Sequence, residues 1–384
     1  MLKNEHEIFS MIDQYIEEII ATGSPENPVW NQEIIRQNAK PHWNYIDGCM
    51  ITALMKLYES SRERKYLDFS DSFIDYFIDD EGAILSYRQD EYNLDNIKEG
   101  SVLFKLYDYT GKEKYRKAMD TLYAQLQEQP RTKEGNFWHK QIYPNQIWLD
   151  GLYMAQPFYL EYEKRYGGKK NYDDILNQFR NVTLLLKNKD TGLYFHAYDS
   201  SREMFWCNKE TGLSPNYWLR ALGWFVMSLV DVLELLDETE DAEFYTMISE
   251  TFRDLVNALL RYQDQSGMWY QVVDRQDEER NYLETSGSSI ISYAILKAVH
   301  LGILSQDFAT LGKKAFMGIC EKYLYRDSEG KMNLGGTCLV GGLGGKQMRD
   351  GSFEYYMSEP VVENEAKGIA PFLLAYIYLK ELGI

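Results

Sequence analysis

Six glycine-containing turns recur along the chain, and this repeat constrains the fold more than any other feature. Each turn follows a segment with a helical pattern, and the six are Thr22-Gly23, Glu81-Gly82, Glu134-Gly135, Thr191-Gly192, Ser266-Gly267 and Glu329-Gly330. Glycine at such a place fits a turn or a helix stop, because a left-handed backbone conformation costs it little. A second helical segment follows each turn with a glycine near its start, at Gly48, Gly100, Gly151, Gly223, Gly287 and Gly368. The repeating unit is therefore a pair of helices.

The two helices of a pair differ in how their apolar residues are spaced. Between residues 244 and 259, apolar residues recur at intervals of three and four, which is typical of a helix with one buried face. Between Tyr217 and Leu236, apolar residues cover nearly the whole circumference, which indicates a helix buried on most sides. An outer ring of half-exposed helices around a buried inner ring satisfies both patterns. We therefore predict an all-α fold, an (α/α)6 barrel of six helical hairpins that forms one domain over residues 1–384, with inner glycines where neighbouring helices approach closely.

Charge and composition limit the partners of the chain. The formal net charge is −18, which argues against nucleic acid and against anionic membrane surfaces. The sequence contains no run of about 18 apolar residues, the length that a membrane-spanning helix needs. The charged start of the chain lacks the apolar stretch of a signal peptide. The four cysteines have neither metal-binding nor redox spacing. We expect a cytoplasmic enzyme with reduced cysteines, which is a monomer or a weak homodimer.

In such a barrel, the turns and the starts of the inner helices lie at one end. Six helix N-termini then converge on one mouth, where unpaired N–H groups and positive dipole ends favour an anion such as a carboxylate. The polar and aromatic residues expected at this mouth are Tyr45, Asp95, His139, Lys140, Trp148, Asp150, His196, Trp218, Arg220 and Trp224. Carboxylates, tryptophans, an arginine and a histidine that converge at the mouth of a helical barrel indicate a sugar-binding site.

Each of these residues also has a purely structural interpretation. Asp95 and Asp150 fit the acidic first turn of any helix, the tryptophans fit a core, and Arg220 fits a partner for a buried acid. Their joint placement favours the site. The five histidines form no metal-binding pair, so we expect no metal and no cofactor. The glycine-rich run 335–345 lacks the pattern of a phosphate-binding loop and is interpreted either as a mobile loop over the mouth or as a flexible surface turn.

Several motifs resemble those of glycoside hydrolase family 105, the unsaturated rhamnogalacturonyl hydrolases. They are WLDGLYM at 148–154, the pattern Trp218-x-Arg220-x-x-Gly223-Trp224, GMWYQ at 267–271, and DGSFEYY at 350–356 followed by SEP at 358–360. The resemblance extends from about residue 43 to residue 378. It implies the same barrel that the repeat predicts independently.

The resemblance also implies the reaction. The substrate is an oligosaccharide released by a lyase, with a 4,5-unsaturated uronic acid at its non-reducing end, and unsaturated galacturonyl-rhamnose is the expected example. The C4=C5 bond and the ring oxygen form a vinyl ether. Protonation at C4 and addition of water at C5 give a hemiketal, which opens and releases the second sugar. Because no displacement occurs at the anomeric carbon, the usual spacing rule for two glycosidase carboxylates does not apply.

Residue roles follow from the matching motif positions. Asp150 would protonate C4 and then activate water, which requires a raised pKa. Asp95 would supply a neighbouring carboxylate or hold the water, and the two acids would titrate together. The predicted substrate-binding residues are Arg220 and His196 for the carboxylate and hydroxyls, Trp148, Trp218, Trp224 and Tyr45 around the ring, His139 and Lys140 at the second sugar, and Ser352.

Four other functions remain open at this stage. An unsaturated glucuronyl hydrolase would perform the same chemistry on glycosaminoglycan fragments. A sugar epimerase on the same barrel would need two facing histidines, and only His196 is well placed. A conventional inverting hydrolase would not need a mouth that is rich in anion-binding groups. A non-catalytic sugar-binding barrel would keep its function without Asp150.

Overall fold

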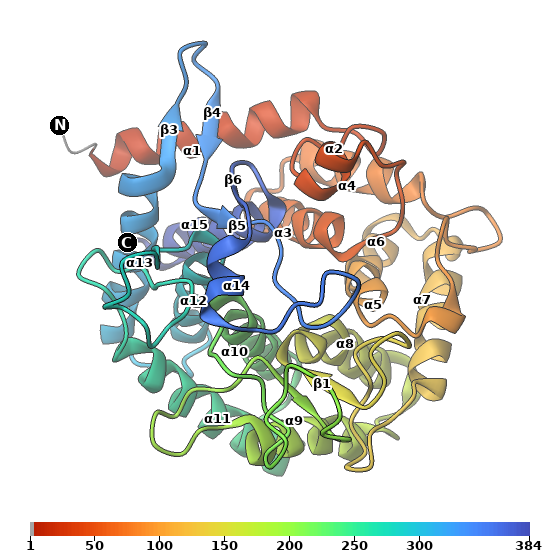
Figure 1. Ribbon diagram of the computed structural model, residues 1–384. Coiled ribbons are helices and arrows are strands. Elements are labelled where there is room, and N and C mark those ends of the chain that lie inside the picture. The colour runs from red at the N-terminus through yellow and green to blue at the C-terminus, as the bar shows by residue number, and fades with distance from the viewer. Residues whose placement is uncertain (1–3) are drawn as a thin grey trace.

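The computed structural model describes residues 4–384, which form two concentric rings of helices (Figure 1). The inner ring consists of α3 (Tyr45–Ser61), α5 (Asp95–Glu99) with its continuation α6 (Leu103–Thr110), α8 (Leu149–Tyr162), α10 (Leu219–Leu235), α12 (Thr285–His300) and α15 (Ala366–Leu382). Each inner helix packs against the next, and α15 closes the ring against α3. A 3-10 turn over Gly100–Val102 joins α5 to α6.

The outer ring consists of α1 (Glu5–Thr22), α4 (Arg64–Asp75), α7 (Glu113–Glu128), α9 (Tyr172–Leu186), α11 (Ala242–Leu260) and α13 (Asp307–Tyr323). The first helix of the chain pairs with the last. Tyr376 of α15 donates a hydrogen bond of 2.8 Å to Asp13 of α1, and its ring meets Phe9 edge-on. This sixth pair completes the barrel, and the predicted all-α (α/α)6 fold is confirmed.

The remaining elements lie between the helices. They are α2 (Gln32–Gln37), α14 (Phe353–Ser358), a 3-10 turn at Gln89–Glu91, a π-helical turn at Glu163–Gly167, and three antiparallel two-stranded sheets, β1 (Gln146–Trp148) with β2 (Ala197–Asp199), β3 (Leu324–Arg326) with β4 (Met332–Leu334), and β5 (Thr337–Cys338) with β6 (Val361–Val362). The pair β1–β2 matters for function because Trp148 lies opposite Ala197. That register brings the start of α8 beside His196.

A recurring backbone hydrogen bond links five of the six repeats to the next, and at the start of α3 the Asn44 N–H donates to the Glu99 carboxylate instead. At the start of an inner helix, one N–H donates to a carbonyl in the loop of the following repeat. The bonds run from Leu94 to His139 (3.1 Å), Leu149 to His196 (3.0 Å), Leu219 to Gln271 (3.0 Å), Thr285 to Gly336 (2.9 Å) and Ala366 to Trp30 (2.8 Å). Because the pattern repeats around the ring, residues in equivalent positions of different repeats occupy equivalent places at the mouth.

The glycine turns differ from the sequence prediction in position. Five of the six lie in tight turns beyond the outer helices, as at Gly82, which follows the end of α4 at Asp75 and closes a turn in which Ile78 pairs with Ile84, whereas Gly23 caps the end of α1. Gly82 adopts a φ of +85°, as predicted. Gly23 does not, since its φ is −81°. It is instead required for packing, because a Cβ there would lie 2.8 Å from the Trp30 ring.

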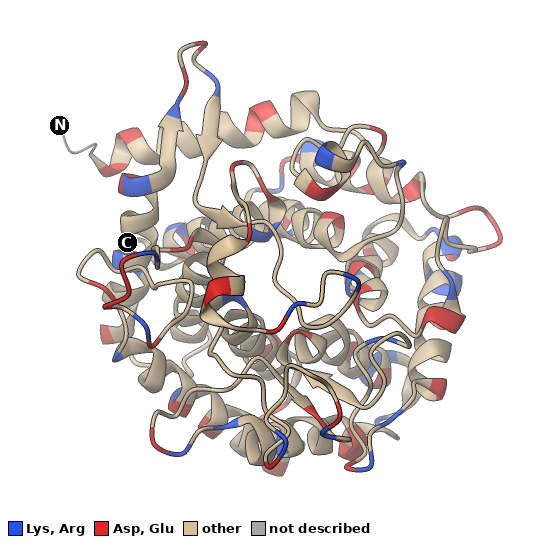
Figure 2. Cartoon of the chain, viewed as in Figure 1, with Lys and Arg blue, Asp and Glu red and all other residues tan. Residues whose placement is uncertain are grey.

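The inner glycines confirm the predicted close approach of neighbouring helices. A Cβ on Gly48 of α3 would lie 2.5 Å from the Cα of Glu99 on α5. A Cβ on Gly287 of α12 would lie 2.3 Å from the Leu219 side chain at the start of α10. Charged segments lie mostly on the outer ring and its loops (Figure 2). Within residues 4–384, the structure has no helix of the length and apolar character that crossing a bilayer requires.

We predict that Gly48→Ala destabilises the barrel and that Gly223→Ala does not. The added methyl at Gly48 meets the backbone of Glu99 at 2.5 Å, and such overpacking costs about 1–3 kcal/mol. At Gly223 the nearest atoms belong to the Ile290 side chain at 3.3 Å, and alanine gains up to about 1 kcal/mol of helix propensity. Urea unfolding of both variants measures the difference. Equal unfolding free energies would contradict the proposed close contact.

Candidate active site

Asp150 and His196 form the first element of the site. Asp150 lies in the first turn of α8, and its Oδ2 lies 3.2 Å from Nε2 of His196. The geometry is too bent for a hydrogen bond, and neither atom has another hydrogen-bond partner. His196 is fully buried and Asp150 is 8% exposed. Within residues 4–384, no lysine or arginine nitrogen lies within 4 Å of the Asp150 carboxylate.

Tyr356 holds the other side of His196. Its hydroxyl lies 2.8 Å from Nδ1 of His196, and burial raises the pKa of Tyr356 well above its ordinary value. The phenol therefore stays protonated and is able to donate this hydrogen bond. Donation to Nδ1 places the proton of a neutral imidazole on Nε2, which faces Asp150. The contact with Tyr356 is therefore compatible with a neutral His196 that has its proton on Nε2.

Asp95 occupies the equivalent position in the preceding repeat but has different partners. Its Oδ1 lies 3.4 Å from Nε2 of His139, and its Oδ2 lies 2.5 Å from the ammonium of Lys140. Burial alone would raise the pKa of Asp95, but Lys140 and His139 outweigh that effect and hold the pKa below its ordinary value. Asp95 is therefore ionised at neutral pH.

The two aspartate–histidine pairs are related by the repeat. Leu94 and Leu149 donate the equivalent backbone hydrogen bonds to the carbonyls of His139 and His196. In each pair the residue after the leucine is the aspartate, and its carboxylate faces the histidine of the next repeat. The residue that follows the histidine differs, being Lys140 in one pair and Ala197 in the other. A single position in the repeat thus decides which carboxylate has a cationic partner.

Trp148 is enclosed by other rings. His139 stacks on Trp148 with ring centroids 4.7 Å apart, and Tyr143 stacks at 4.8 Å. Trp148 is 6% exposed. A sugar therefore meets at most the edge of Trp148 in this conformation.

The other two tryptophans predicted as walls are also buried. Trp218 lies beneath the guanidinium of Arg220, at 4.6 Å from the ring centroid, and stacks on Tyr356 at 5.9 Å. Trp224 stacks on Tyr153 at 4.8 Å. Each is 1% exposed. Because the protein's own side chains cover these rings, neither tryptophan presents a face to the mouth in this conformation.

Arg220 is 1% exposed and has several partners within the protein. Its guanidinium donates to Ser286 at 3.2 Å and to the backbone carbonyl of Cys338. The carboxylate of Glu284 lies 4.0 Å away. Glu284 is therefore the buried acid that the structural interpretation of Arg220 requires. The guanidinium also anchors β5 through the Cys338 carbonyl.

The glycine-rich run 335–345 crosses the mouth (Figure 1). This is the position that its interpretation as a loop over the mouth predicted. A Cβ on Gly341 would lie 2.3 Å from Trp218, and Leu343 packs with Trp148 and Trp206. Ser352 lies at the end of the same segment, where it caps α14 by accepting a hydrogen bond of 3.1 Å from the Tyr355 N–H. Ser352 therefore positions the segment that carries Tyr356.

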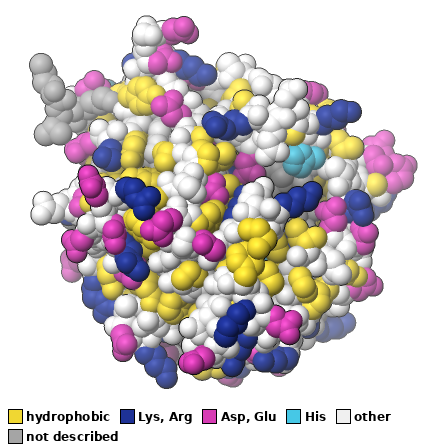
Figure 3. All heavy atoms as spheres, in the orientation of Figure 1, with side chains coloured by type: hydrophobic (Ala, Val, Ile, Leu, Met, Phe, Trp, Pro, Cys, Tyr) yellow, Lys and Arg dark blue, Asp and Glu magenta, His cyan; other side chains and the backbone are white. Residues whose placement is uncertain are grey.

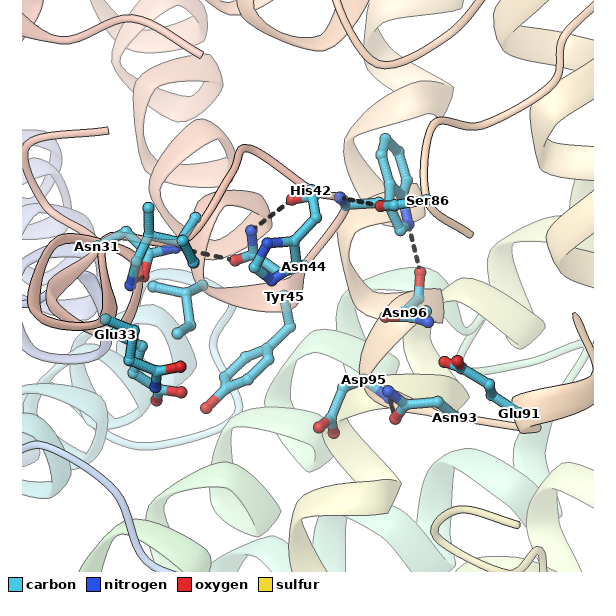
Figure 4. Close-up of a pocket in the computed structure, with 15 residues that line it drawn as sticks. Asn31, Glu33, His42, Asn44, Tyr45, Ser86, Glu91, Asn93, Asp95 and Asn96 are labelled. Carbon is cyan, nitrogen blue, oxygen red and sulfur yellow. Dashed lines mark hydrogen bonds between the residues drawn. The ribbon is translucent and has the colours of Figure 1, made fainter. Parts of the chain in front are cut away.

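A cavity of about 420 Å³ opens beside Asp95. Tyr45, Glu33 and Asp95 extend toward it from three different elements (Figure 4). The space-filling view shows a hollow beside a histidine side chain on this face (Figure 3). Four asparagines, Asn31, Asn44, Asn93 and Asn96, add further polar lining. Asp150 does not line this cavity, although the chain of contacts through His139 and Trp148 connects the two places.

The electrostatics of the mouth differ from the sequence prediction. Carboxylates of the protein cap two of the six inner helices: Glu284 accepts from the Gly287 N–H at 2.7 Å in α12, and Glu365 accepts from the Lys367 N–H at 3.4 Å in α15. The starts of α5, α8 and α10 have no side-chain cap. The preference for an external anion is therefore restricted to the part of the mouth where Asp95, Asp150 and Arg220 lie.

The structure brings together Asp95, His139, Lys140, Trp148, Asp150, His196, Trp218 and Arg220 through direct contacts. Tyr45 joins them through the cavity. Trp224 and Ser352 lie outside this group. Sequence reasoning missed Tyr356, Tyr143 and Glu284. A signal was available for Tyr356, which lies within the motif at 350–356, but only the fold shows that its hydroxyl reaches His196.

We predict that His139 makes the stability of the fold depend on pH. Burial lowers the pKa of His139 from about 6.5 to about 4, so between these values the unfolded chain binds a proton that the folded chain does not. Stability is therefore full above about pH 6.5 and falls as the pH approaches 4, by up to about 3 kcal/mol. Denaturant unfolding at pH 7 and pH 5 measures the loss.

His139→Gln should reduce this loss, whereas the control His300→Gln, at an exposed histidine, should keep it. The same loss in wild type and in His139→Gln would contradict the assignment to His139.

Comparisons with known proteins identify the family of the chain. The model of Glycosyl Hydrolase Family 88 matches residues 18–382. A solved glycoside hydrolase of family 105 from C. acetobutylicum is 44% identical, with a TM-score of 0.86 over 96% of this chain and all of that chain. A possible family 105 member from Salmonella enterica is 21% identical, with a TM-score of 0.78 over all of this chain and 96% of that chain, and shows the shared fold.

Two further relatives match more than half of the chain. Protein Atu3128 of Agrobacterium fabrum is 40% identical over 58% of this chain and 97% of its own length. The unsaturated rhamnogalacturonyl hydrolase YesR of Bacillus subtilis is 28% identical over 67% of this chain and 71% of its own length. With the family model and the barrel, these matches show that the chain belongs to glycoside hydrolase family 105, the unsaturated uronyl hydrolases related to family 88.

Proposed function

We propose that this enzyme releases a 4,5-unsaturated galacturonic acid from the rhamnose of rhamnogalacturonan fragments, with Asp150 as the general acid. The observation that carries the proposal is the difference between the two aspartates at the mouth. Asp95 is neutralised by Lys140 at 2.5 Å, whereas Asp150 faces the ring of His196 and has no cationic partner within residues 4–384.

The difference between the partners of Asp95 and Asp150 supports Asp150 as the proton donor. An ion pair favours the charged form of a carboxyl group, so Asp95 is a poor acid at neutral pH. A carboxyl group without a cationic partner, buried among aromatic rings, is a better proton donor. Asp150 lies among Trp148, His196 and Tyr356. Of the two aspartates, Asp150 is the one that no lysine or arginine holds in an ion pair, which supports it as the proton donor.

The proposed steps balance with one water molecule. Protonated Asp150 transfers its proton to C4, which leaves cationic character on C5 and the ring oxygen. The Asp150 carboxylate then takes a proton from water while the water oxygen bonds to C5, so that Asp150 returns to its acid form. The hemiketal opens, and the resulting hemiacetal at C1 loses the second sugar as an alcohol.

The second sugar is assigned to the cavity beside Asp95. Its lining of asparagines, Tyr45 and Glu33 offers donors and acceptors for sugar hydroxyls and one half-buried aromatic ring. His139 and Lys140 lie between this cavity and Asp150. The relation to YesR supports rhamnose as this sugar.

The buried residues of the predicted set act on the site indirectly. Arg220 holds β5 and covers Trp218, and Ser352 holds α14. We assign Arg220, Trp218, Trp224 and Ser352 to the positioning of His196, Tyr356 and the loop over the mouth. A sugar that stacks on Trp148 or Trp218 has to displace the side chains that cover these rings first.

We predict that Asp150→Asn abolishes the reaction. Asparagine has nearly the same shape but cannot donate the proton to C4, so the rate should fall at least about a thousandfold (~4 kcal/mol). The ultraviolet absorbance of the conjugated double bond in unsaturated galacturonyl-rhamnose follows the reaction. Asp190→Asn, at an exposed aspartate, is the matched control and should retain wild-type activity.

Substrate comparison separates this proposal from its nearest alternative. Faster loss of absorbance with an unsaturated glucuronyl disaccharide than with the galacturonyl-rhamnose would reject rhamnogalacturonan as the substrate but keep the reaction. An unreactive wild type with both substrates would reject the reaction itself.

We predict that Tyr356→Phe lowers kcat about tenfold and changes KM little, because the substitution removes only the hydrogen bond to Nδ1 of His196. The pH profile of kcat should also shift, since the proton of His196 is no longer held on Nε2. Tyr325→Phe removes a hydroxyl far from the mouth, on the exposed face of β3, and should change neither quantity. A Tyr356→Phe enzyme with the wild-type kcat and pH profile would remove Tyr356 from the site.

A further inference from the structure

A second cavity, of about 320 Å³, lies in the barrel away from the mouth. All six inner helices contribute to its lining, with Thr52 of α3, Lys98 of α5, Tyr153 of α8, Asp231 of α10, Lys297 of α12 and Tyr378 of α15. On each helix the lining residue follows the start of the helix, which lies at the mouth. The cavity therefore extends into the barrel from the end opposite the mouth, and at Lys98 and Tyr153 it comes within one helical turn of Asp95 and Asp150.

Most charged groups around this cavity are paired. Lys297 lies 2.7 Å from Asp231 and 2.6 Å from Glu234. The other paired cations of the lining are Lys56 with Glu381, Lys105 with Glu59, and Arg165 with Glu161 and Asp108. Carboxylates of the protein thus neutralise four of the five cationic side chains that line the cavity.

Lys98 is the exception. It is 3% exposed, and within residues 4–384 no carboxylate oxygen lies within 4 Å of its ammonium. Its one side-chain hydrogen bond goes to the Thr52 hydroxyl at 3.3 Å, and the ammonium lies 5.0 Å from the Tyr153 ring centroid. An ammonium has three N–H donors, so one hydrogen bond leaves donors available. A buried cation without an anion is costly, and burial accordingly lowers the pKa of Lys98.

The remaining lining defines which anion fits. Asp231, Glu161 and Glu234 accept hydrogen bonds but repel a second negative charge, so a phosphate dianion is disfavoured. Tyr153, Tyr293 and Tyr378 offer aromatic surface to an aliphatic ring. A single carboxylate on a hydroxylated ring satisfies all three features: the carboxylate meets Lys98, the hydroxyls donate to the acids, and the ring packs on tyrosine.

We propose that this cavity is a second ligand site, which binds a sugar acid or similar hydroxylated monocarboxylate through Lys98. The site is separate from the catalytic one, and its argument uses neither Asp150 nor the proposed reaction.

Calorimetric titration of the full chain with D-galacturonate tests the site. Lys98→Met keeps the length of the side chain and removes its charge, and it should weaken binding at least tenfold. Lys170→Met, at an exposed lysine, is the matched control and should bind as wild type does. Asp150→Asn should retain the Lys98-dependent binding. Neutral D-galactose should bind at least tenfold more weakly than galacturonate.

Three outcomes would overturn the proposal. They are no binding of galacturonate, binding that survives in Lys98→Met but disappears in Asp150→Asn, and equal binding of galactose and galacturonate. A crystal structure of the wild type soaked in galacturonate tests the site without any variant. Ligand density beside Lys98 supports the proposal, and density confined to the mouth rejects it.

Discussion

A backbone hydrogen bond from the start of an inner helix to the loop of the next repeat, present at five of the six inner helices, is the constraint on which the mouth of this barrel depends. The same donor position is used from Leu94 round to Ala366. Because a buried N–H must find an acceptor, each loop is held at a fixed height above the inner ring. The close contacts at Gly48 and Gly287 bring the inner helices near enough for the ring to close. The residues that follow the donors, among them Asp95, Asp150 and Arg220, therefore lie at the mouth, at the starts of their helices.

This regularity explains how one architecture produces two different aspartates. Asp95 and Asp150 occupy the same position of adjacent repeats, and each faces a histidine from the next repeat. The residue after the histidine then decides the electrostatics. Lys140 reaches Asp95, whereas Ala197 carries no charge and packs with Trp148 and Leu343. The difference between Asp95 and Asp150, on which the proposed role of Asp150 rests, thus comes from the presence of one lysine after the histidine in one repeat and its absence in the next.

The sequence could predict the barrel because its signal is periodic. Glycine turns and the contrast between half-buried and buried helices are properties of single segments, and the helix pairs follow from them. The starts of the inner helices, with Asp95, Asp150 and Arg220, were predictable for the same reason. The exposure of Trp148, Trp218 and Trp224 was not, because it depends on rings from other repeats that cover them. The capping of α12 and α15 by Glu284 and Glu365 was missed because acidic residues are common before any helix, and only the fold shows where the carboxylate points.

The same helices that build the mouth also build the cavity at the other end. Lys98 follows Asp95 by one turn on α5, and Tyr153 follows Asp150 by one turn on α8. α5 is short and passes into a 3-10 turn at Gly100, so its two ends are closer together than those of the other inner helices. Its three ionisable side chains have different partners: Asp95 pairs with Lys140, Glu99 accepts a hydrogen bond from the Asn44 N–H, and Lys98 has no carboxylate partner within the described chain. In a chain with a net charge of −18, the proposed second ligand site rests on this one buried lysine without a carboxylate partner, together with the tyrosines and carboxylates that line the cavity around it.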